Sequence, residues 1–189
     1  VWPAEYNLSA FGQEYVLPLR RQDVIALSIG FLPQQQRIEY AVGFFDGDGC
    51  VTTTGRIQSG CKLTIGQSAA QGEALVLFLT LFGGVVHRRG CGQGSIRPVA
   101  QWDLKPFEDV RNVANTLGQH PSLKKYQLNL AEAWPKSLPE RIVARERLRQ
   151  LKDAAPQVSD VHCTWSYLAG FFDAEGCISV LAVGNQINL

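Results

Sequence analysis

Residues 40–51 read YAVGFFDGDGCV, and residues 167–178 read YLAGFFDAEGCI. Seven of the twelve positions are identical, and the copies keep a constant offset of 127 residues, as from Gly43 to Gly170. Such a repeat does not arise by chance, so the chain holds two copies of one structural element. Only the residues from Ser179 to Leu189 follow the second copy. We therefore expect one full repeat unit and the start of a second.

Small residues lie four positions apart within each copy. They are Gly43 and Gly47 in the first copy, and Gly170 and Ala174 in the second. On a helix, this spacing places two minimal side chains on one face. Two such faces can pack with their backbones in unusually close contact. The pattern predicts that both copies are helices that cross at these four residues.

Each predicted helix ends with an acidic residue, Asp48 or Glu175, and then a glycine, Gly49 or Gly176, suited to the left-handed conformation that often follows a helix. The helix macrodipole disfavours a carboxylate there by roughly 0.3–1 kcal/mol. The crossing would also bring the two like charges together, which is unfavourable. A divalent cation would offset both effects, because hard oxygen ligands suit magnesium and such sites favour phosphodiester hydrolysis. The alternative interpretation is a pair of solvated helix ends.

Residues 41–49 (AVGFFDGDG) and 168–176 (LAGFFDAEG) resemble the two motifs of a double-motif, monomeric LAGLIDADG homing endonuclease. The resemblance implies an α+β fold, in which each αββαββα unit carries a four-stranded, saddle-like antiparallel sheet that lies along the DNA major groove. It also implies that Asp48 and Glu175 bind the catalytic metals, Mg²⁺ or Mn²⁺, with Ca²⁺ as a non-catalytic substitute. The first motif departs from the family pattern by opening with Ala41, which is a packing change.

Two earlier acids, Asp46 and Asp173, match a family position that is more structural than catalytic. We expect them to hydrogen-bond to the helix and its neighbours.

Two further segments extend the resemblance. Residues 63–67 (LTIGQ) are similar to the family's second strand, which implies that Gln67 helps to order solvent near the metals. Residues 123–130 (LKKYQLNL) resemble the segment that supplies the active-site lysine, and the alignment favours Lys124 without excluding Lys125. Such a lysine could stabilise negative charge near the scissile phosphate or polarise the attacking water. The alternative for both lysines is a solvated helix face.

The chain between the motifs reads as mixed helix and strand. Runs rich in Val, Ile and Thr, or bounded by glycine turns, predict strands at 50–57, 61–67, 85–91 and 96–104. Apolar residues at helical spacing predict helices at 70–82, 107–117 and 123–134, and a basic amphipathic helix at 140–152.

These elements divide the chain into four parts. We expect an N-terminal extension (1–36), a first LAGLIDADG unit (37–137), a connecting helix and linker (138–160), and an incomplete second unit (161–189). The sequence contains no methionine, so we expect a fragment or processed product of a protein that is a monomer at full length. Because half of the saddle is missing, we expect little or no activity from these 189 residues unless another chain completes them.

A sheet in the major groove presents alternate side chains to base edges. Polar and basic residues on the predicted strands are the candidates for DNA contacts, although the register that decides which of them face DNA is open. The candidates are Thr52, Thr54, Arg56, Gln58, Lys62, Arg88, Arg89 and Arg97.

Charge and composition limit the function classes. The net charge is only +1, but residues 105–155 carry ten basic and six acidic groups. No apolar run approaches the roughly 18 residues of a membrane span, so we expect no membrane partner. Five cysteines without a CxxC pair predict no structural zinc site, and they indicate reduced thiols inside a cell, in an organelle or a prokaryotic cytoplasm.

The resemblance therefore implies a site-specific endonuclease for double-stranded DNA with a long target site, associated with an intron or intein. An alternative is an RNA maturase that binds intron RNA and assists splicing. A second is a non-catalytic DNA-binding protein on the same scaffold, which would be expected to lose one of the two acids. A remnant whose second half no longer folds is a third.

Overall fold

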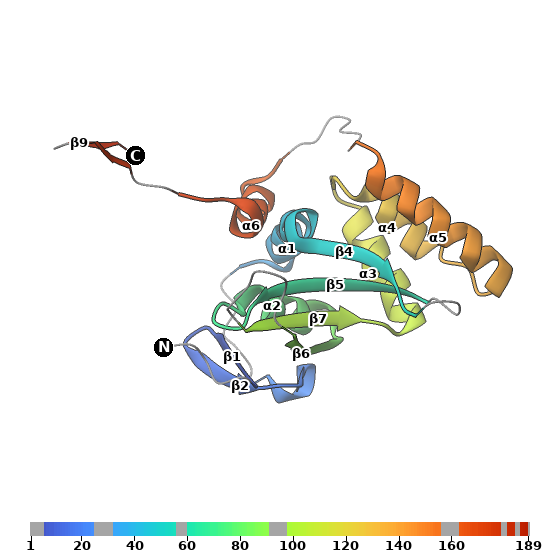
Figure 1. Cartoon of the computed structure of the whole chain (residues 1–189), viewed down its shortest axis with the longest axis horizontal. Coiled ribbons are helices and arrows are strands. Elements are labelled where there is room, and N and C mark those ends of the chain that lie inside the picture. The colour runs from blue at the N-terminus through green and yellow to red at the C-terminus, as the bar shows by residue number, and fades with distance from the viewer. Residues whose placement is uncertain are drawn as a thin grey trace.

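The first repeat copy forms most of helix α1 (Gln34–Asp48), and the second forms helix α6 (Trp165–Glu175). The computed structural model describes residues 6–24, 32–55, 60–90, 98–155 and 163–178, and the backbone of 181–183 and 186–188. Figure 1 shows α1 and α6 side by side next to a single large sheet, which confirms the predicted α+β architecture.

The large sheet has five strands in the order β3-β6-β7-β5-β4, and all neighbouring strands are antiparallel. The four predicted strands are present as β4 (Gly49–Thr53), β5 (Cys61–Ser68), β6 (Val85–Arg89) and β7 (Val99–Leu104). The four predicted strands are thus confirmed, and β3 (Leu19–Arg20) adds a fifth by pairing with β6 at the edge. A strand of two residues has no periodicity by which the sequence could reveal it.

The remaining helices occur where the apolar spacing predicted them. They are α2 (Glu73–Phe82), α3 (Phe107–Gly118), α4 (Lys125–Glu132) and α5 (Leu138–Asp153). Together with α1 they give the predicted αββαββα order and its connecting helix. No helix in the described part of the chain is long and apolar enough to span a bilayer.

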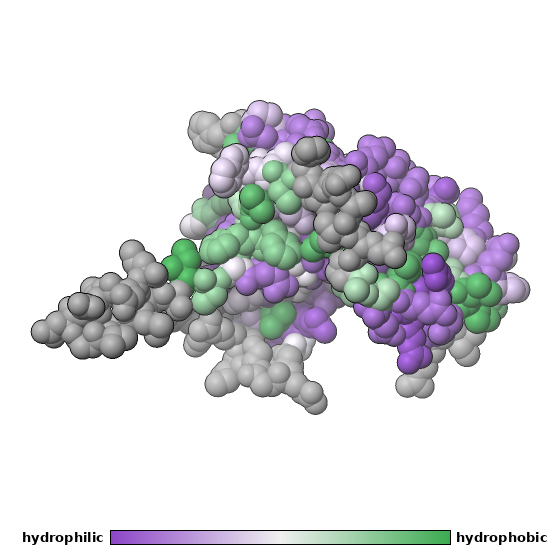
Figure 2. Space-filling view, turned by 90° about the horizontal axis from the view of Figure 1, so that it is seen from above, coloured by the Kyte–Doolittle hydropathy of each residue, from purple (hydrophilic) through white to green (hydrophobic). Residues whose placement is uncertain are grey.

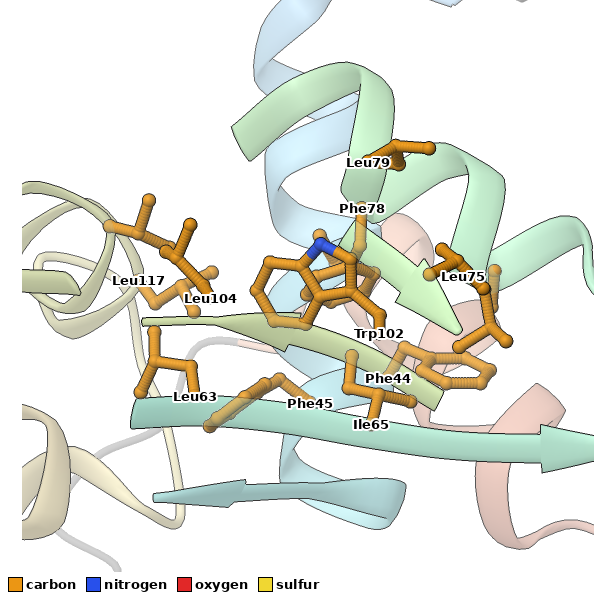
Figure 3. Packing of buried hydrophobic residues seen from close by; sticks show 14 of the residues in the cluster. Phe44, Phe45, Leu63, Ile65, Leu75, Phe78, Leu79, Trp102, Leu104 and Leu117 are labelled. Carbon is orange, nitrogen blue, oxygen red and sulfur yellow. The ribbon is translucent and has the colours of Figure 1, made fainter. Parts of the chain in front are cut away.

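The core lies between one face of the sheet and the helices (Figure 3). Alternate strand residues such as Leu63 and Ile65 point into it, together with Phe45 from α1. Trp102 packs against Phe78 with ring centroids 5.2 Å apart. The close packing of these large buried side chains holds the end of α1 rigidly against the sheet.

The N-terminal segment, expected only as an extension, contributes to the same core. Strands β1 (Asn7–Ala10) and β2 (Gln13–Val16) form a hairpin, followed by β3 and the 3₁₀ helix η1 (Arg21–Asp23). The side chain of Leu8 is fully buried, and Ser9 donates a backbone hydrogen bond of 2.8 Å to Ala69. Residues 6–24 therefore pack as part of the first unit.

Helices α1 and α6 cross at the small residues. A Cβ added at Gly43 would collide with the carbonyl oxygen of Tyr167 and lie 2.9 Å from the amide nitrogen of Phe171. A Cβ added at Gly170 would collide in the same way with Tyr40 and lie 2.9 Å from the nitrogen of Phe44. Only glycine allows this backbone approach, and the contact is symmetrical between the copies.

The glycines that follow the two helices differ from the prediction. Gly49 and Gly176 both have φ −74° and ψ 149°, an extended conformation that any residue adopts. The left-handed cap predicted for them is therefore wrong. Their small size has another reason, because a Cβ at either position would collide with a phenylalanine of the preceding turn, Phe45 or Phe172.

The two repeat helices differ in how their apolar faces are covered. Phe45 is 1% exposed under the sheet, whereas its equivalent on α6, Phe172, is 49% exposed and Trp165 is 88% exposed. Figure 2 shows hydrophobic residues gathered on this side of the molecule, where Leu168 and Ile178 are also exposed. Beyond α6, the backbone forms a short hairpin of β8 (Leu181–Val183) and β9 (Gln186–Asn188).

Candidate active site

The C-terminal ends of α1 and α6 bring Asp48 and Glu175 together. Gly47 is in the last turn of α1, and a Cβ added there would lie 2.9 Å from Cγ of Glu175. The Glu175 side chain therefore packs directly against the turn that carries Asp48. The helix crossing is the cause, because both helices end at the same point beyond it.

The two carboxylates influence each other electrostatically. Burial raises the pKa of Asp48 above its ordinary value, and the charge of Glu175 raises it further. A hydrogen bond from Gln67 and the charge of Lys124 act in the opposite direction but do not cancel the increase. The pair thus holds negative charge that the protein alone does not fully compensate.

Gln67, near the end of β5, contacts Asp48 directly, since its side-chain amide donates a hydrogen bond to Oδ2 of that residue. It lies on the same face of the strand as Leu63 and Ile65, toward α1. The bond fixes the orientation of the Asp48 carboxylate.

Lys124 lies just before α4 and reaches the end of α1. Its ammonium donates to three carbonyl oxygens, those of Phe45 (2.9 Å), Gly47 (3.0 Å) and Gly49 (2.5 Å). Burial lowers its pKa, and nearby carboxylates oppose that change. The side chain adds a donor to carbonyls at the helix end, where that of Phe45 also accepts from the Gly49 amide, and it places a cation beside Asp48. Lys125 is exposed, so Lys124 is the lysine that the fold brings to the two acids.

Asp46 is a buried carboxylate that organises the same region. It accepts hydrogen bonds from the Ser122 hydroxyl (2.6 Å) and from the backbone amides of Leu123 (2.8 Å) and Lys124 (3.3 Å). The Tyr167 hydroxyl of α6 also donates to it, at 2.8 Å. Ser122 and Tyr167 had no signal in the sequence, apart from the position of Tyr167 at the start of the repeat.

The two carboxylates are suited to a divalent cation that takes its other ligands from outside the protein. Within the described part of the chain, no third His, Cys, Asp or Glu joins Asp48 and Glu175 in a metal-binding group. Magnesium commonly uses one or two carboxylates together with phosphate oxygens and water. Two converging carboxylates with uncompensated charge therefore fit an ion whose other ligands come from a nucleic acid and solvent.

The face of the sheet opposite the core is the second part of the site. Strand pairing and alternation place Thr52 and Lys62 opposite each other on this open face. Arg89 also lies there, because a Cβ added at Gly66 of β5 would meet its guanidinium at 3.5 Å. Thr54 follows β4, and its hydroxyl donates to the carbonyl of Gly60 at 3.3 Å.

Arg88 points to the other side of the sheet. It shares the face of the buried Val86, and its guanidinium lies 5.2 Å from the ring centre of Tyr6. We therefore remove Arg88 from the group of predicted DNA-contacting residues. Arg56, Gln58 and Arg97 lie outside the described residues.

A polar cluster on the open face had not been predicted. Asp103 on β7 is buried and accepts hydrogen bonds from Gln101 (2.6 Å) and Lys62 (3.2 Å), with Lys105 at 3.0 Å and His87 at 3.8 Å. Alternation from the buried Trp102 could have placed Asp103 on the face opposite the core. Lys62 and His87 come from two other strands, so the sequence contained no signal that they would meet Asp103.

Among the solved structures that resemble this chain are I-CvuI, I-GzeII and I-SmaMI. The homing endonuclease I-CvuI, in complex with I-CreI target DNA that is not cleaved in the presence of Mg, gives a TM-score of 0.55 at 20% identity, covering 66% of this chain and 87% of that chain. The LAGLIDADG homing endonuclease I-GzeII, in complex with its DNA target, gives 0.57 at 12% identity, covering 79% and 63%. I-SmaMI, bound to uncleaved DNA with calcium ions, gives 0.51 at 14% identity, covering 76% and 60%. No protein-family model and no curated protein matches the sequence. At these identities the likeness lies in the fold.

Proposed function

We propose that this chain, which has the LAGLIDADG homing-endonuclease fold, acts in site-specific, divalent-metal-dependent hydrolysis of double-stranded DNA. The observation that carries the proposal is the meeting of Asp48 and Glu175 at the helix crossing, with Gln67 and Lys124 beside Asp48. The neighbours I-CvuI and I-GzeII are endonucleases in complex with DNA targets. We also propose that the chain derives from an intron or intein.

The residues have distinct roles in this proposal. Asp48 and Glu175 would hold Mg²⁺ or Mn²⁺, which when bound neutralises developing charge and activates water. Gln67 keeps the Asp48 carboxylate in one orientation. Lys124 provides a fixed positive charge at the end of α1, where it can stabilise negative charge on the scissile phosphate.

The open face of the sheet would read the DNA. Thr52, Lys62 and Arg89 project from three different strands of that face, so together they span several base pairs of a long target. Arginine can pair bidentately with guanine, and lysine suits phosphate oxygens. Arg56, Gln58 and Arg97, which lie outside the described residues, complete the proposed group.

A two-step experiment tests the proposal. A randomised duplex library is first selected for binding to the wild-type chain in Ca²⁺, and the recovered duplexes are then incubated in Mg²⁺. We expect one target sequence to be enriched, and to be cut slowly, because the apolar face of α6 is uncovered. Asp48→Asn and Glu175→Gln should bind the target without cutting it. Asp153→Asn, at the exposed end of α5, is the matched acid-to-amide control and should cut like the wild type.

Three results would contradict the proposal. Cutting that survives Asp48→Asn or Glu175→Gln removes the metal role of these acids. Enrichment of a DNA target that the wild type does not cut favours a non-catalytic DNA-binding protein. Failure to enrich any duplex, combined with tight binding of structured RNA, favours a maturase.

A further inference from the structure

The first residue of each repeat copy forms a hydrogen bond with the other copy. The Tyr40 hydroxyl donates to Oδ2 of Asp173 at 2.7 Å, and the Tyr167 hydroxyl donates to Oδ2 of Asp46 at 2.8 Å. Tyr167 and Asp173 are the equivalents of Tyr40 and Asp46 at the offset of 127 residues. The two bonds are therefore reciprocal, one on each side of the glycine crossing.

The two carboxylates that accept these bonds have different surroundings. Asp46 is 6% exposed and also accepts from Ser122, Leu123 and Lys124. Asp173 is exposed, and among the described residues it accepts from no loop equivalent to residues 122–124. Of the two reciprocal bonds, the one from Tyr167 therefore connects α6 to the loop that carries Lys124.

The loop at residues 122–124 is anchored at two points. Asp46 accepts from the backbone amide of Lys124, and the ammonium of the same residue donates to the carbonyls of Phe45, Gly47 and Gly49. A carboxylate has about four acceptor positions, and Asp46 receives a donor at each of them. A fully satisfied buried network of this kind is rigid, because each bond restricts the others.

We propose that Tyr167 is a positioning residue that couples the docking of α6 to the placement of Lys124. Its hydroxyl fixes the Asp46 carboxylate, and this carboxylate in turn holds the backbone of Leu123 and Lys124. The lysine is thus aligned with Asp48 only when the second motif, which brings Glu175, is in place. The significance for cleavage rests on the proposed function, whereas the coupling itself does not.

The two tyrosines form a matched pair for the test. Tyr167→Phe and Tyr40→Phe each remove one hydroxyl and one bond between α1 and α6. The measurement is hydrogen–deuterium exchange of the Leu123 and Lys124 amides, with exchange across residues 165–175 as a report on α6 docking. We expect Tyr167→Phe to speed exchange at both amides about tenfold, whereas Tyr40→Phe leaves them unchanged. Equal effects of the two variants on these amides, or no effect of Tyr167→Phe, would overturn the proposal.

A third variant distinguishes the proposed coupling from a general loosening of α6. Ser122→Ala removes another donor to Asp46 from within the loop. It should speed exchange at the same two amides while exchange of residues 165–175 stays at the wild-type rate. If Ser122→Ala leaves both amides protected, Asp46 does not control the loop and the coupling is refuted.

A cleavage assay separates the coupling from the proposed function. On the selected target in Mg²⁺, Tyr167→Phe should lower the single-turnover rate at least about tenfold more than Tyr40→Phe, with unchanged DNA affinity. Equal rates for the two variants would remove the role in positioning the lysine. If the exchange results hold while the wild type cuts no DNA, the coupling stands and the proposed nuclease function fails.

Discussion

Lys62 Nζ lies 3.2 Å from Oδ1 of Asp103, so a lysine on the open face of the sheet is paired with a carboxylate on the same face. Lys105 Nζ lies 3.0 Å from Oδ2 of Asp103, and the side-chain amide of Gln101 donates a hydrogen bond of 2.6 Å to Oδ1. The cluster has more basic than acidic groups, which leaves a surface suited to phosphate, and its buried carboxylate keeps the cations in fixed positions.

Asp103 should give the stability of the fold a specific pH dependence. Burial would raise the pKa of this carboxyl, but hydrogen bonds from Gln101, Lys105 and Lys62 outweigh burial and lower the pKa to about 2. Because the unfolded value is about 3.9, the carboxylate stabilises the fold above that pH, and its contribution is lost as the pH falls toward about 2. Urea unfolding across this range should show a loss of up to about 2 kcal/mol. Asp103→Asn should flatten the profile, and a profile identical to that of Asp153→Asn would argue against the cluster.

Arg89 and Arg88 are adjacent residues on opposite faces of β6, and they test the orientation of the DNA surface. Arg89→Ala should weaken DNA binding. It should also reduce the slope of the logarithm of the binding constant against the logarithm of the salt concentration by about one. Arg88→Ala should leave DNA affinity unchanged within about twofold and act on stability instead, because its guanidinium packs on Tyr6. Fluorescence anisotropy at several salt concentrations measures both. The opposite ranking would mean that DNA binds the other face.

Lys124 and Lys125 differ in role although they are neighbours. Lys124→Met removes a donor from three carbonyls at the end of α1, of which that of Phe45 still accepts from the Gly49 amide, and we expect it to cost about 1–3 kcal/mol of unfolding free energy. We also expect about a 100-fold slower cleavage. Lys125→Met changes an exposed side chain and should alter stability by less than about 0.5 kcal/mol. Urea unfolding and single-turnover cleavage distinguish the two, and equal effects would contradict the assignment.

Metal binding should be visible in thermal stability without any DNA cutting. Burial and the charge of Glu175 raise the pKa of Asp48. Protonation of Asp48 should therefore stabilise the metal-free fold as the pH falls through this raised pKa. Asp48→Asn should increase the melting temperature of the metal-free protein, since it removes one of two like charges. Mg²⁺ should increase the melting temperature of the wild type but not that of Asp48→Asn. A variant that still responds to Mg²⁺ like the wild type would exclude Asp48 as a ligand.

The close crossing of α1 and α6 can be tested with a single methyl group. Gly43→Ala would push its Cβ into the Tyr167 carbonyl, and we expect a cost of about 1–3 kcal/mol to helix docking. Exchange across residues 165–175 should then become faster. Gly90→Ala is the control, because a Cβ at that position meets nothing within 4 Å. If both variants exchange alike, the helices are not in backbone contact at Gly43.

Much of the fold could be predicted because its signals are local. The repeated small residues four positions apart predict the helix crossing, and strand and helix periodicities locate every long element within a few residues. The exceptions near the N-terminus are short strands: the hairpin of β1 and β2 was not predicted, and the two residues of β3 are a strand only because β6 lies beside them. The capping prediction for Gly49 was wrong for a similar reason, since the residue is small to avoid Phe45 and its backbone is extended.

What the sequence alone determined is the presence of two equivalent helices, each with a glycine-lined face and a terminal acid, because spacing along a helix depends only on neighbouring residues. The tertiary structure decided which partners these residues meet: Tyr167 with Asp46, Lys124 with the end of α1, and Asp103 with Lys62. It also decided which of Arg88 and Arg89 lies on the open face of the sheet. Hydrogen bonds and ion pairs between distant segments depend on distances of a few tenths of an ångström, and only the packing of whole elements sets those distances.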